Sequence, residues 1–227
     1  ALNLAFRYLS YLGTPDRSAE QIAQEMYQLA CSFNLGSGST ATSISVNGLA
    51  ENLPKAIEIV EDLARNAVGD ETILENLKAD MLKSRSDAKH NQSRCFSALQ
   101  RYVMYGPEFI RKTTLTDSEI MSLTSEELLA KVRDLLDCSH EVLYYGPDSE
   151  SEVKAMLKGS HKVAAELKPL EKTYTALVPT PSSKVYLAQY DAKQLYYLQY
   201  SNREERLDIA SDPYLALYNE YFGGGMN

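Results

Sequence analysis

The chain has 227 residues, of which 44% are hydrophobic and 24% are charged, and its formal net charge is -8. This composition predicts a globular protein with a real core, either one large domain or one domain and part of another. An acidic chain lacks the basic surface that phosphate backbones require, so nucleic acid is excluded as the main partner. No apolar run in the sequence approaches the length of a membrane-spanning helix.

Neither the cysteines nor the histidines stand at the spacing of a metal site. The residues concerned are Cys31, Cys95, Cys138, His90, His140 and His161. An odd number of cysteines without Cys-x-x-Cys spacing predicts neither a disulfide framework nor a cysteine zinc site, so we expect buried small apolar side chains. The histidines are scattered along the sequence, which favours surface or helix-capping positions.

Amphipathic helices fill most of the first part of the chain. The apolar spacing predicts helices over residues 1–12, 18–32, 52–67, 71–89 and 91–104. Ser18 and Gln21 form a capping box at the start of the second helix, and Pro54 stands just inside the third. Between these two helices we expect a glycine- and serine-rich turn over residues 34–39 and a half-buried strand over residues 40–47.

Shorter helices and separate strands are predicted for the second part of the chain. Capping boxes at Thr116/Glu119, Thr124/Glu127 and Ser149/Glu152 predict three helices, and the last helix is expected over residues 213–222. Strands are predicted over residues 141–145, 184–190 and 194–200. The predicted strands are amphipathic rather than continuously apolar, which favours an antiparallel sheet with helices on one face, an α+β fold.

A linker is predicted over residues 163–183, which hold prolines and paired serines without apolar periodicity. It divides a first domain over residues 1–162 from the beginning of a second domain over residues 184–227. The chain starts within one helical pattern and stops just after another, so we expect it to be a fragment of a longer protein.

Several segments of the chain stand in the order found in one peptidase family. Phe6–Thr14 resembles a helix that ends in Leu-Gly-Thr, and Lys83–Lys89 resembles the long helix of the same repeat. The other similar segments are Ser39–Leu49, Asn52–Ala67, His140–Pro147 and Tyr218–Asn227. Together they resemble the M16 (pitrilysin/insulinase-type) zinc metallopeptidases, most closely the non-catalytic C-terminal half of a large bacterial member with two homologous halves.

The zinc motif of that family is degenerate in this chain. The family's chemistry needs His-x-x-Glu-His on the first helix, with two histidines one turn apart on the metal and the glutamate as general base. In the register set by the Leu-Gly-Thr segment, the three positions hold Leu4, Arg7 and Tyr8. The third-ligand position falls near Lys83–Arg85, again without a carboxylate. The resemblance therefore implies the inactive half of such a peptidase, with no catalytic residue in this chain.

The resemblance also implies a fold, a cofactor and partners. The fold is expected to be of the LuxS/MPP-like metallohydrolase type, a helix-backed antiparallel sheet whose first strands this chain lacks. We expect no cofactor in this chain and zinc in the catalytic half of the parent protein, a zinc metallopeptidase. The expected partners are that catalytic half and the peptide substrates that the two halves enclose. A location in the periplasm or cell envelope fits the resemblance to bacterial members. We also expect self-association of the chain through an exposed sheet edge or through apolar helix faces.

Two other classes of function stay open on the sequence. The chain could be a structural or interaction subunit of the same fold without peptidase activity, or an unrelated enzyme. A His-x-x-Glu-His motif in the sequence upstream of Ala1 would favour the peptidase over the structural subunit. Stoichiometric zinc or peptide cleavage by this chain would favour an independent enzyme.

Overall fold

The computed structural model describes residues 2–38, 41–169, 176–202 and 209–223. Some predictions fall outside these ranges, namely those for residue 1 of the first helix, residue 39 of the predicted turn, residue 40 of the strand predicted after it, residues 170–175 of the linker and residues 224–227 of the glycine-rich segment.

The chain divides into two compact units. Unit 1 holds residues 1–87 and 115–173, and unit 2 holds residues 88–114 and 174–227. The first unit therefore consists of two stretches of sequence with part of the second unit between them. The division of the chain at residues 163–183 stays a prediction.

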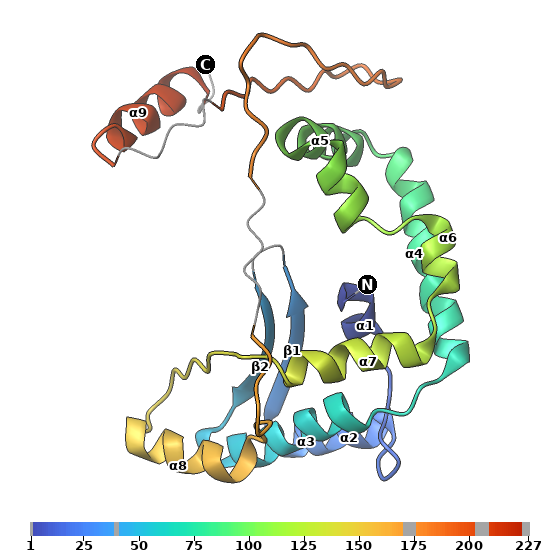
Figure 1. The fold of residues 1–227 in the computed structure, drawn as a ribbon, viewed down its shortest axis with the longest axis vertical. Coiled ribbons are helices and arrows are strands. Elements are labelled where there is room, and N and C mark those ends of the chain that lie inside the picture. The colour runs from blue at the N-terminus through green and yellow to red at the C-terminus, as the bar shows by residue number, and fades with distance from the viewer. Residues whose placement is uncertain (1, 39–40, 170–175, 203–208, 224–227) are drawn as a thin grey trace. The chain divides into compact units, whose positions relative to one another are not determined.

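Helices form most of the described part of the chain (Figure 1). The helices that begin in unit 1 are α1 (Leu2–Leu9), α2 (Ala19–Gln28), the short η1 (Ala50–Asn52), α3 (Leu53–Asn66), α4 (Glu71–Lys89), α6 (Asp117–Ser122), α7 (Ser125–Leu136) and α8 (Glu150–Ser160). Unit 2 contributes α5 (Gln92–Thr113) and α9 (Asp212–Phe222). Each α-helix begins at or next to a predicted start, so the apolar periodicity and the caps predicted the helix starts correctly.

The described strands form one antiparallel hairpin, β1 (Cys31–Ser37) with β2 (Thr42–Gly48). The register runs from Cys31 opposite Gly48 to Ser37 opposite Thr42. Alternate apolar side chains of the two strands, such as Phe33 and Ile44, pack partly buried against the helical core. Helices together with an antiparallel sheet confirm the predicted α+β class.

Two sequence predictions in this region are wrong. Residues 31–32 do not continue the second helix, and residues 34–37 are not a turn, because Cys31–Ser37 is a strand. Ala30 ends the helical region with φ at 50°, a left-handed conformation that an alanine rarely adopts. The glycine and serines of this stretch indicate a turn locally, but pairing with β2 satisfies the backbone and outweighs that preference.

The core of unit 1 lies between the hairpin and the helices. Helices α1, α2 and α3 contact the hairpin, α7 packs on α1 and α3, and α8 packs on α3. The fully buried large side chains of this core include Tyr8, Leu4, Leu9, Leu63, Leu74, Leu128 and Val132. Helix α1 is in the middle of this packing, since its residues contact both the hairpin and α7.

The predicted capping boxes are present at α2, α6, α7 and α8. In each box the capping hydroxyl accepts from the third helical N–H, and the side chain at that position accepts from the capping N–H. These bonds lower the pKa of the three glutamates: the backbone N–H and then the hydroxyl of the threonine do so for Glu119 and Glu127, and the hydroxyl and then the N–H of Ser149 for Glu152. The boxes therefore fix the helix starts most firmly while these carboxylates are ionised.

The helix predicted to stop at residue 104 continues past a kink. Gly106 has φ at 76° and ψ at 170°, and Pro107 follows it. Glycine tolerates this positive φ, and proline starts the next helical turn without needing an N–H partner. The helical region α5 therefore consists of two segments of different direction.

The strands predicted over residues 141–145, 184–190 and 194–200 are wrong. These residues are extended or irregular and form no ladder with any other part of the chain that the structure describes. A strand is stabilised by a hydrogen-bonded neighbour and by an apolar layer against one face. The alternation of the three segments is that of strands, but no described neighbour supplies the pairing.

In unit 2, the extended segments pack one face on α5. Tyr186 contacts Tyr102 edge to face with the ring centroids 6.4 Å apart, and Tyr196 stacks on Phe96 at 5.4 Å. The Gln92 amide donates to the backbone carbonyl of residue 194 at 2.6 Å. The tyrosine-rich alternation of these segments therefore serves packing on a helix.

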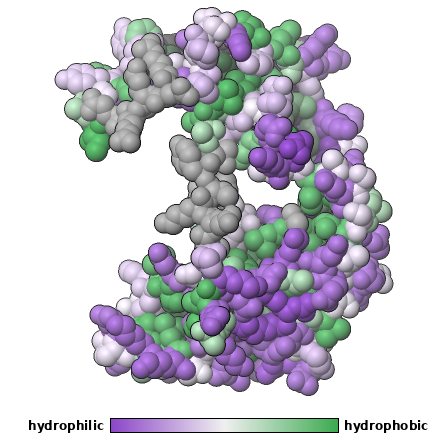
Figure 2. Space-filling model, in the orientation of Figure 1, coloured by the Kyte–Doolittle hydropathy of each residue, from purple (hydrophilic) through white to green (hydrophobic). Residues whose placement is uncertain are grey.

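Each extended segment also carries large apolar side chains that are exposed. In unit 2, Val185 is 94% exposed and Leu195 is 86% exposed, and in the unit 1 segment 141–145 Leu143 is 92% exposed. The hydropathy surface shows apolar patches on both units among the hydrophilic residues (Figure 2). Large apolar side chains exposed along an extended backbone are typical of a surface that another element covers.

Truncating the core at α7 should destabilise unit 1. Leu128 is 0% exposed, so Leu128→Ala is expected to cost about 2–5 kcal/mol of unfolding free energy through lost burial and a cavity. Tyr27 on α2 is 84% exposed, and Tyr27→Ala should stay within about 0.5 kcal/mol of the wild type. Urea unfolding followed by circular dichroism measures both, and equal losses in the two variants would contradict this packing.

Candidate functional site

The degenerate motif positions lie on α1, which belongs to the core. Leu4 and Tyr8 stand four residues apart on the buried face of the helix, with exposed fractions of 1% and 0%. Arg7 is exposed. The face on which two metal ligands one turn apart would stand is therefore occupied by a leucine and a tyrosine that pack into the core.

The hydroxyl of Tyr8 joins three elements through hydrogen bonds. It accepts from the backbone N–H of Asp70 at 2.6 Å and lies 2.9 Å from the Asp70 carbonyl oxygen. It also lies 2.7 Å from the hydroxyl of Ser125, which is buried at the start of α7. A buried phenol needs such partners, because an unpaired hydroxyl in an apolar core is costly. Tyr8 thus connects α1 to the residue before α4 and to the first residue of α7.

Position 69 must be a glycine for steric reasons. A Cβ placed there would lie 1.9 Å from the Ser125 hydroxyl oxygen and 3.4 Å from the Tyr8 hydroxyl oxygen. No side chain fits within that distance, so the chain before α4 can approach α7 only as glycine. The Tyr8–Asp70–Ser125 contact is therefore a built structural junction.

The third-ligand position of the resemblance lies on α4. Lys83 and Ser84 are exposed, and the Arg85 guanidinium donates to the carboxylate of Asp117 at 2.7 Å. The carboxylate beside Arg85 is thus that of Asp117, which belongs to α6 and forms an ion pair with it. Two turns before Arg85 on α4, the buried Lys78 donates to Glu75 at 2.8 Å and to the Met121 carbonyl at 3.1 Å. The polar groups of this helix thus serve to hold α6.

Metal-ligand clusters and membrane-spanning helices are both absent from the described residues. Within the described ranges, no group of three or more histidine, cysteine, aspartate or glutamate side chains could hold a metal ion. Over the same residues, no helix is long and apolar enough to cross a membrane.

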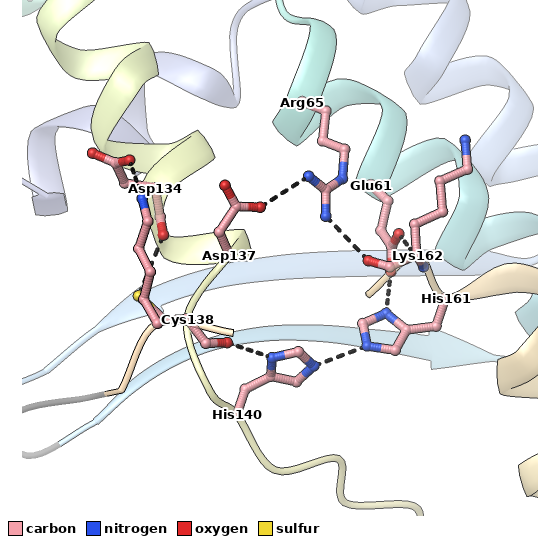
Figure 3. Close-up of polar contacts among 9 residues, drawn as sticks. Glu61, Arg65, Asp134, Asp137, Cys138, His140, His161 and Lys162 are labelled. Atoms are coloured by element: carbon pink, nitrogen blue, oxygen red, sulfur yellow. Dashed lines mark hydrogen bonds and ion pairs between the residues drawn. The ribbon is translucent and has the colours of Figure 1, made fainter. Parts of the chain in front are cut away.

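Two of the scattered histidines meet at the end of α8. His161, the C-cap of α8, contacts the carboxylate of Glu61 on α3 through Nδ1, and its Nε2 lies 2.9 Å from Nε2 of His140 (Figure 3). The other nitrogen of His140, Nδ1, lies 2.8 Å from the Cys138 carbonyl oxygen. The second carboxylate oxygen of Glu61 accepts from the Lys162 N–H at 2.9 Å. We call Glu61, His140 and His161 the imidazole cluster.

Ion pairs surround the imidazole cluster. Arg65 of α3 donates to Asp137 at 3.4 Å and to the Lys162 carbonyl at 3.1 Å (Figure 3). Lys168 donates to Asp134 at 2.9 Å, which lowers the pKa of Asp134 and raises that of Lys168. The ends of α7 and α8 and the residues near 168 are therefore held together by polar contacts.

Two open grooves lie on unit 1, and neither is lined by a histidine. The first, of about 490 Å³, runs along α6 and α7 and is lined by Leu115, Glu119, Ser122, Leu123, Glu127, Ala130, Lys131 and Asp134. The second, of about 460 Å³, is lined by Leu2, Lys131, Asp134, Leu135, Cys138 and Lys168. Acidic and basic side chains line both grooves, and Lys131 and Asp134 are common to the two.

Sequence reasoning missed the imidazole cluster and the role of Tyr8. His140 and His161 are 21 residues apart, and Glu61 precedes His161 by 100 residues, so no local spacing links them. Tyr8 can be placed on the inner face of α1 from periodicity, but its partners at residues 70 and 125 come from other helices. Cys31 is buried, as predicted from composition, whereas Cys95 and Cys138 are half-buried.

No family model matches the chain, and a search of curated proteins finds no match. The fold is similar to that of solved proteases. A mutant of the ferredoxin protease FusC, in complex with Arabidopsis ferredoxin, matches 78% of this chain and 20% of its own with a TM-score of 0.62 and 11% identity. The periplasmic protease PqqL from Escherichia coli matches 78% of this chain and 19% of its own with a TM-score of 0.57 and 17% identity.

An inactive peptidase M16 domain from Pseudomonas fluorescens matches 58% of this chain and 32% of its own, with a TM-score of 0.49 and 18% identity. The fold of this chain is therefore similar to that of FusC and PqqL, which are both proteases. The chain spans about a fifth of the length of these two proteases.

Removing the Tyr8 hydroxyl should destabilise the junction. Tyr8→Phe leaves the Asp70 N–H and the Ser125 hydroxyl without this partner in a buried site, at an expected cost of about 1–3 kcal/mol. Tyr11 is 55% exposed, so Tyr11→Phe should change stability by less than about 0.5 kcal/mol. Thermal unfolding of the two variants tests this, and equal stability of Tyr8→Phe and wild type would show that the junction contributes nothing.

Proposed function

We propose that this chain is part of the non-catalytic half of an M16-type zinc peptidase, and that it helps to enclose peptides for cleavage by a zinc-bearing half. The observation that carries the proposal is the buried face of α1. Where active members need imidazoles and a carboxylate, this helix has Leu4 in the core, Arg7 in solvent and Tyr8 in a structural junction.

Chemistry at α1 argues against zinc on that face. Leucine offers no ligand atom, and the guanidinium of Arg7 is permanently cationic. The Tyr8 hydroxyl already lies within hydrogen-bond distance of the Asp70 N–H and of Ser125, so binding a cation would break contacts that hold α4 and α7. The position nominated for a third ligand carries Lys83 and Arg85, whose charge would repel the ion.

The fold supports the class of protein in this proposal. Two solved proteases share it over 78% of this chain, although each is about five times as long as the matched region. A protein of that length has room for a second half that bears the metal. Zinc in that half, peptides as substrates and a chamber between the halves are all part of the proposal.

The exposed extended segments fit an interface within a larger assembly. Residues 141–145 carry Val142, Leu143 and Tyr145 in exposed positions on an extended backbone with no strand partner among the described residues. Such a segment gains backbone hydrogen bonds and buried area when another strand is added beside it. The other half of the proposed peptidase would supply that element.

The decisive test begins with the coding sequence upstream of Ala1. The proposal expects His-x-x-Glu-His there, in a half that binds one zinc ion and cleaves unfolded peptides. The zinc-bearing half by itself should cleave peptides at least tenfold more slowly than the full protein. Adding this chain should restore the cleavage rate, whereas adding an unrelated acidic domain at equal concentration should not. An upstream half without the motif would favour a structural subunit, and full activity of the isolated catalytic half would refute the chamber role.

The isolated chain should self-associate through its exposed extended segments. Leu143→Lys combined with Tyr145→Lys adds charge to a segment in which both of these side chains are almost fully exposed, and should shift the assembly toward monomer. Tyr27→Lys on α2 is the matched control and should leave self-association unchanged. Light scattering after size-exclusion chromatography measures the mass, and a monodisperse wild-type monomer at high concentration would rule this out.

A further inference from the structure

The imidazole cluster has more hydrogen-bond contacts than neutral histidines can supply. A carbonyl oxygen only accepts, so Nδ1 of His140 must carry the proton that it donates to Cys138 at 2.8 Å. The Glu61 carboxylate likewise accepts from Nδ1 of His161, while its other oxygen accepts from the Lys162 N–H. A neutral imidazole has one N–H, so both Nε2 atoms would be left with lone pairs only.

Those two Nε2 atoms nevertheless face one another at hydrogen-bond distance. They lie 2.9 Å apart while the ring centroids lie 5.1 Å apart, so both nitrogens stand close to the line between the ring centres. Two lone pairs at this distance repel, and one cation between them removes the repulsion. The cluster as it stands therefore requires one charge more than two neutral imidazoles carry.

A proton fits this gap and a metal ion does not. A metal on the line between the nitrogens would need them about 4 Å apart, because each metal–imidazole bond is about 2.0–2.1 Å long. A metal bound off that line would need both lone pairs to converge on one side, whereas here they point at each other. An N–H donating from one ring to the other matches the observed separation.

We propose that Glu61, His140 and His161 bind one shared proton, and that this proton ties the start of the extended segment 141–145 to helices α3 and α8. The carboxylate of Glu61 balances the added charge, and its side chain is only 13% exposed. His140 is the last residue before the segment, and its contact with His161 spans 21 residues of sequence. The bond therefore fixes the position from which the exposed apolar side chains project.

Charged groups from several elements lie around the cluster (Figure 3). They are Glu61 and Arg65 from α3, Asp134 from α7, Asp137 at the C-cap of α7, His161 and Lys162 at the end of α8, and Lys168. Arg65 is paired with Asp137, and Lys168 with Asp134. The carboxylate of Glu61 is the charge in direct contact with an imidazole of the cluster.

The hydrogen bond between Nε2 of His140 and Nε2 of His161 should have a bell-shaped dependence on pH. Histidine changes its charge between about pH 5 and pH 8. With one proton in the pair the Nε2 bond exists; loss of that proton at higher pH leaves two facing lone pairs. A second proton at lower pH leaves two facing N–H groups and two positive charges, so the bond is lost there as well.

Ring-nitrogen NMR of the 15N-labelled chain, recorded with a chelator from about pH 4.5 to pH 9, tests the proposal. The two rings are expected to titrate as a coupled pair, with an Nε2–H signal at intermediate pH. Exchange of the Ser139 and Lys162 amide protons, corrected for intrinsic rates, should be about tenfold faster at pH 9 than at pH 6.5. In the structure these N–H groups donate to the Lys168 carbonyl and to Glu61.

Two variants isolate the shared proton. His161→Asn keeps a donor near the Nδ1 position for Glu61 and removes Nε2. His140 should then titrate as a single group, and the amide protons of Ser139 and Lys162 should no longer exchange about tenfold faster at pH 9 than at pH 6.5. His140→Asn is the reciprocal variant at an exposed residue, which keeps the test available if the first variant unfolds. His90→Asn is the control for loss of a histidine elsewhere and should behave as wild type.

The outcomes separate cleanly. Coupled titration in wild type and in His90→Asn, lost in both cluster variants, supports the shared proton. Independent titration of the two rings in wild type overturns it. Coupling that appears only after Zn²⁺ or Ni²⁺ is added also overturns it, in favour of a metal-binding pair. The proposal does not rest on the proposed peptidase function and can fail or succeed separately from it.

Discussion

Burial of one face of helix α1 is the constraint on which unit 1 depends. That face lies against the hairpin on one side and α7 on the other, so every side chain on it must be apolar or fully hydrogen bonded. Leu4 meets the first condition, and Tyr8 meets the second through Asp70 and Ser125. A metal site on the same face would place a divalent charge and its ligands in this packing, which is costly unless every group is paired.

Polar contacts of two kinds hold the rest of unit 1. Near α1 and α4 they are enclosed: Tyr8 is fully buried, and Lys78 is only 3% exposed while it bridges to Glu75 and to the Met121 carbonyl. Around the ends of α7 and α8 they are partly exposed and contain the histidines. The first group supports the packing of the helices in the core, and the second joins α3 to the ends of α7 and α8.

The extended segments explain why a helix-rich chain keeps so much apolar surface. Residues 184–200 use one face to pack on α5 through Tyr186 and Tyr196, and the other face stays exposed. A strand has two faces and two edges, and a single helix covers only one face.

Local signals in the sequence determined the helices, because capping boxes and apolar spacing act within one or two turns and need no distant partner. They also placed Leu4 and Tyr8 on one face of α1. Tertiary structure decided everything that depends on pairing. Cys31–Ser37 became a strand because β2 lies beside it, while residues 141–145 did not, because no described strand does. The contacts of Tyr8 with Ser125 and of His161 with Glu61 join residues about a hundred positions apart, which no sequence spacing encodes.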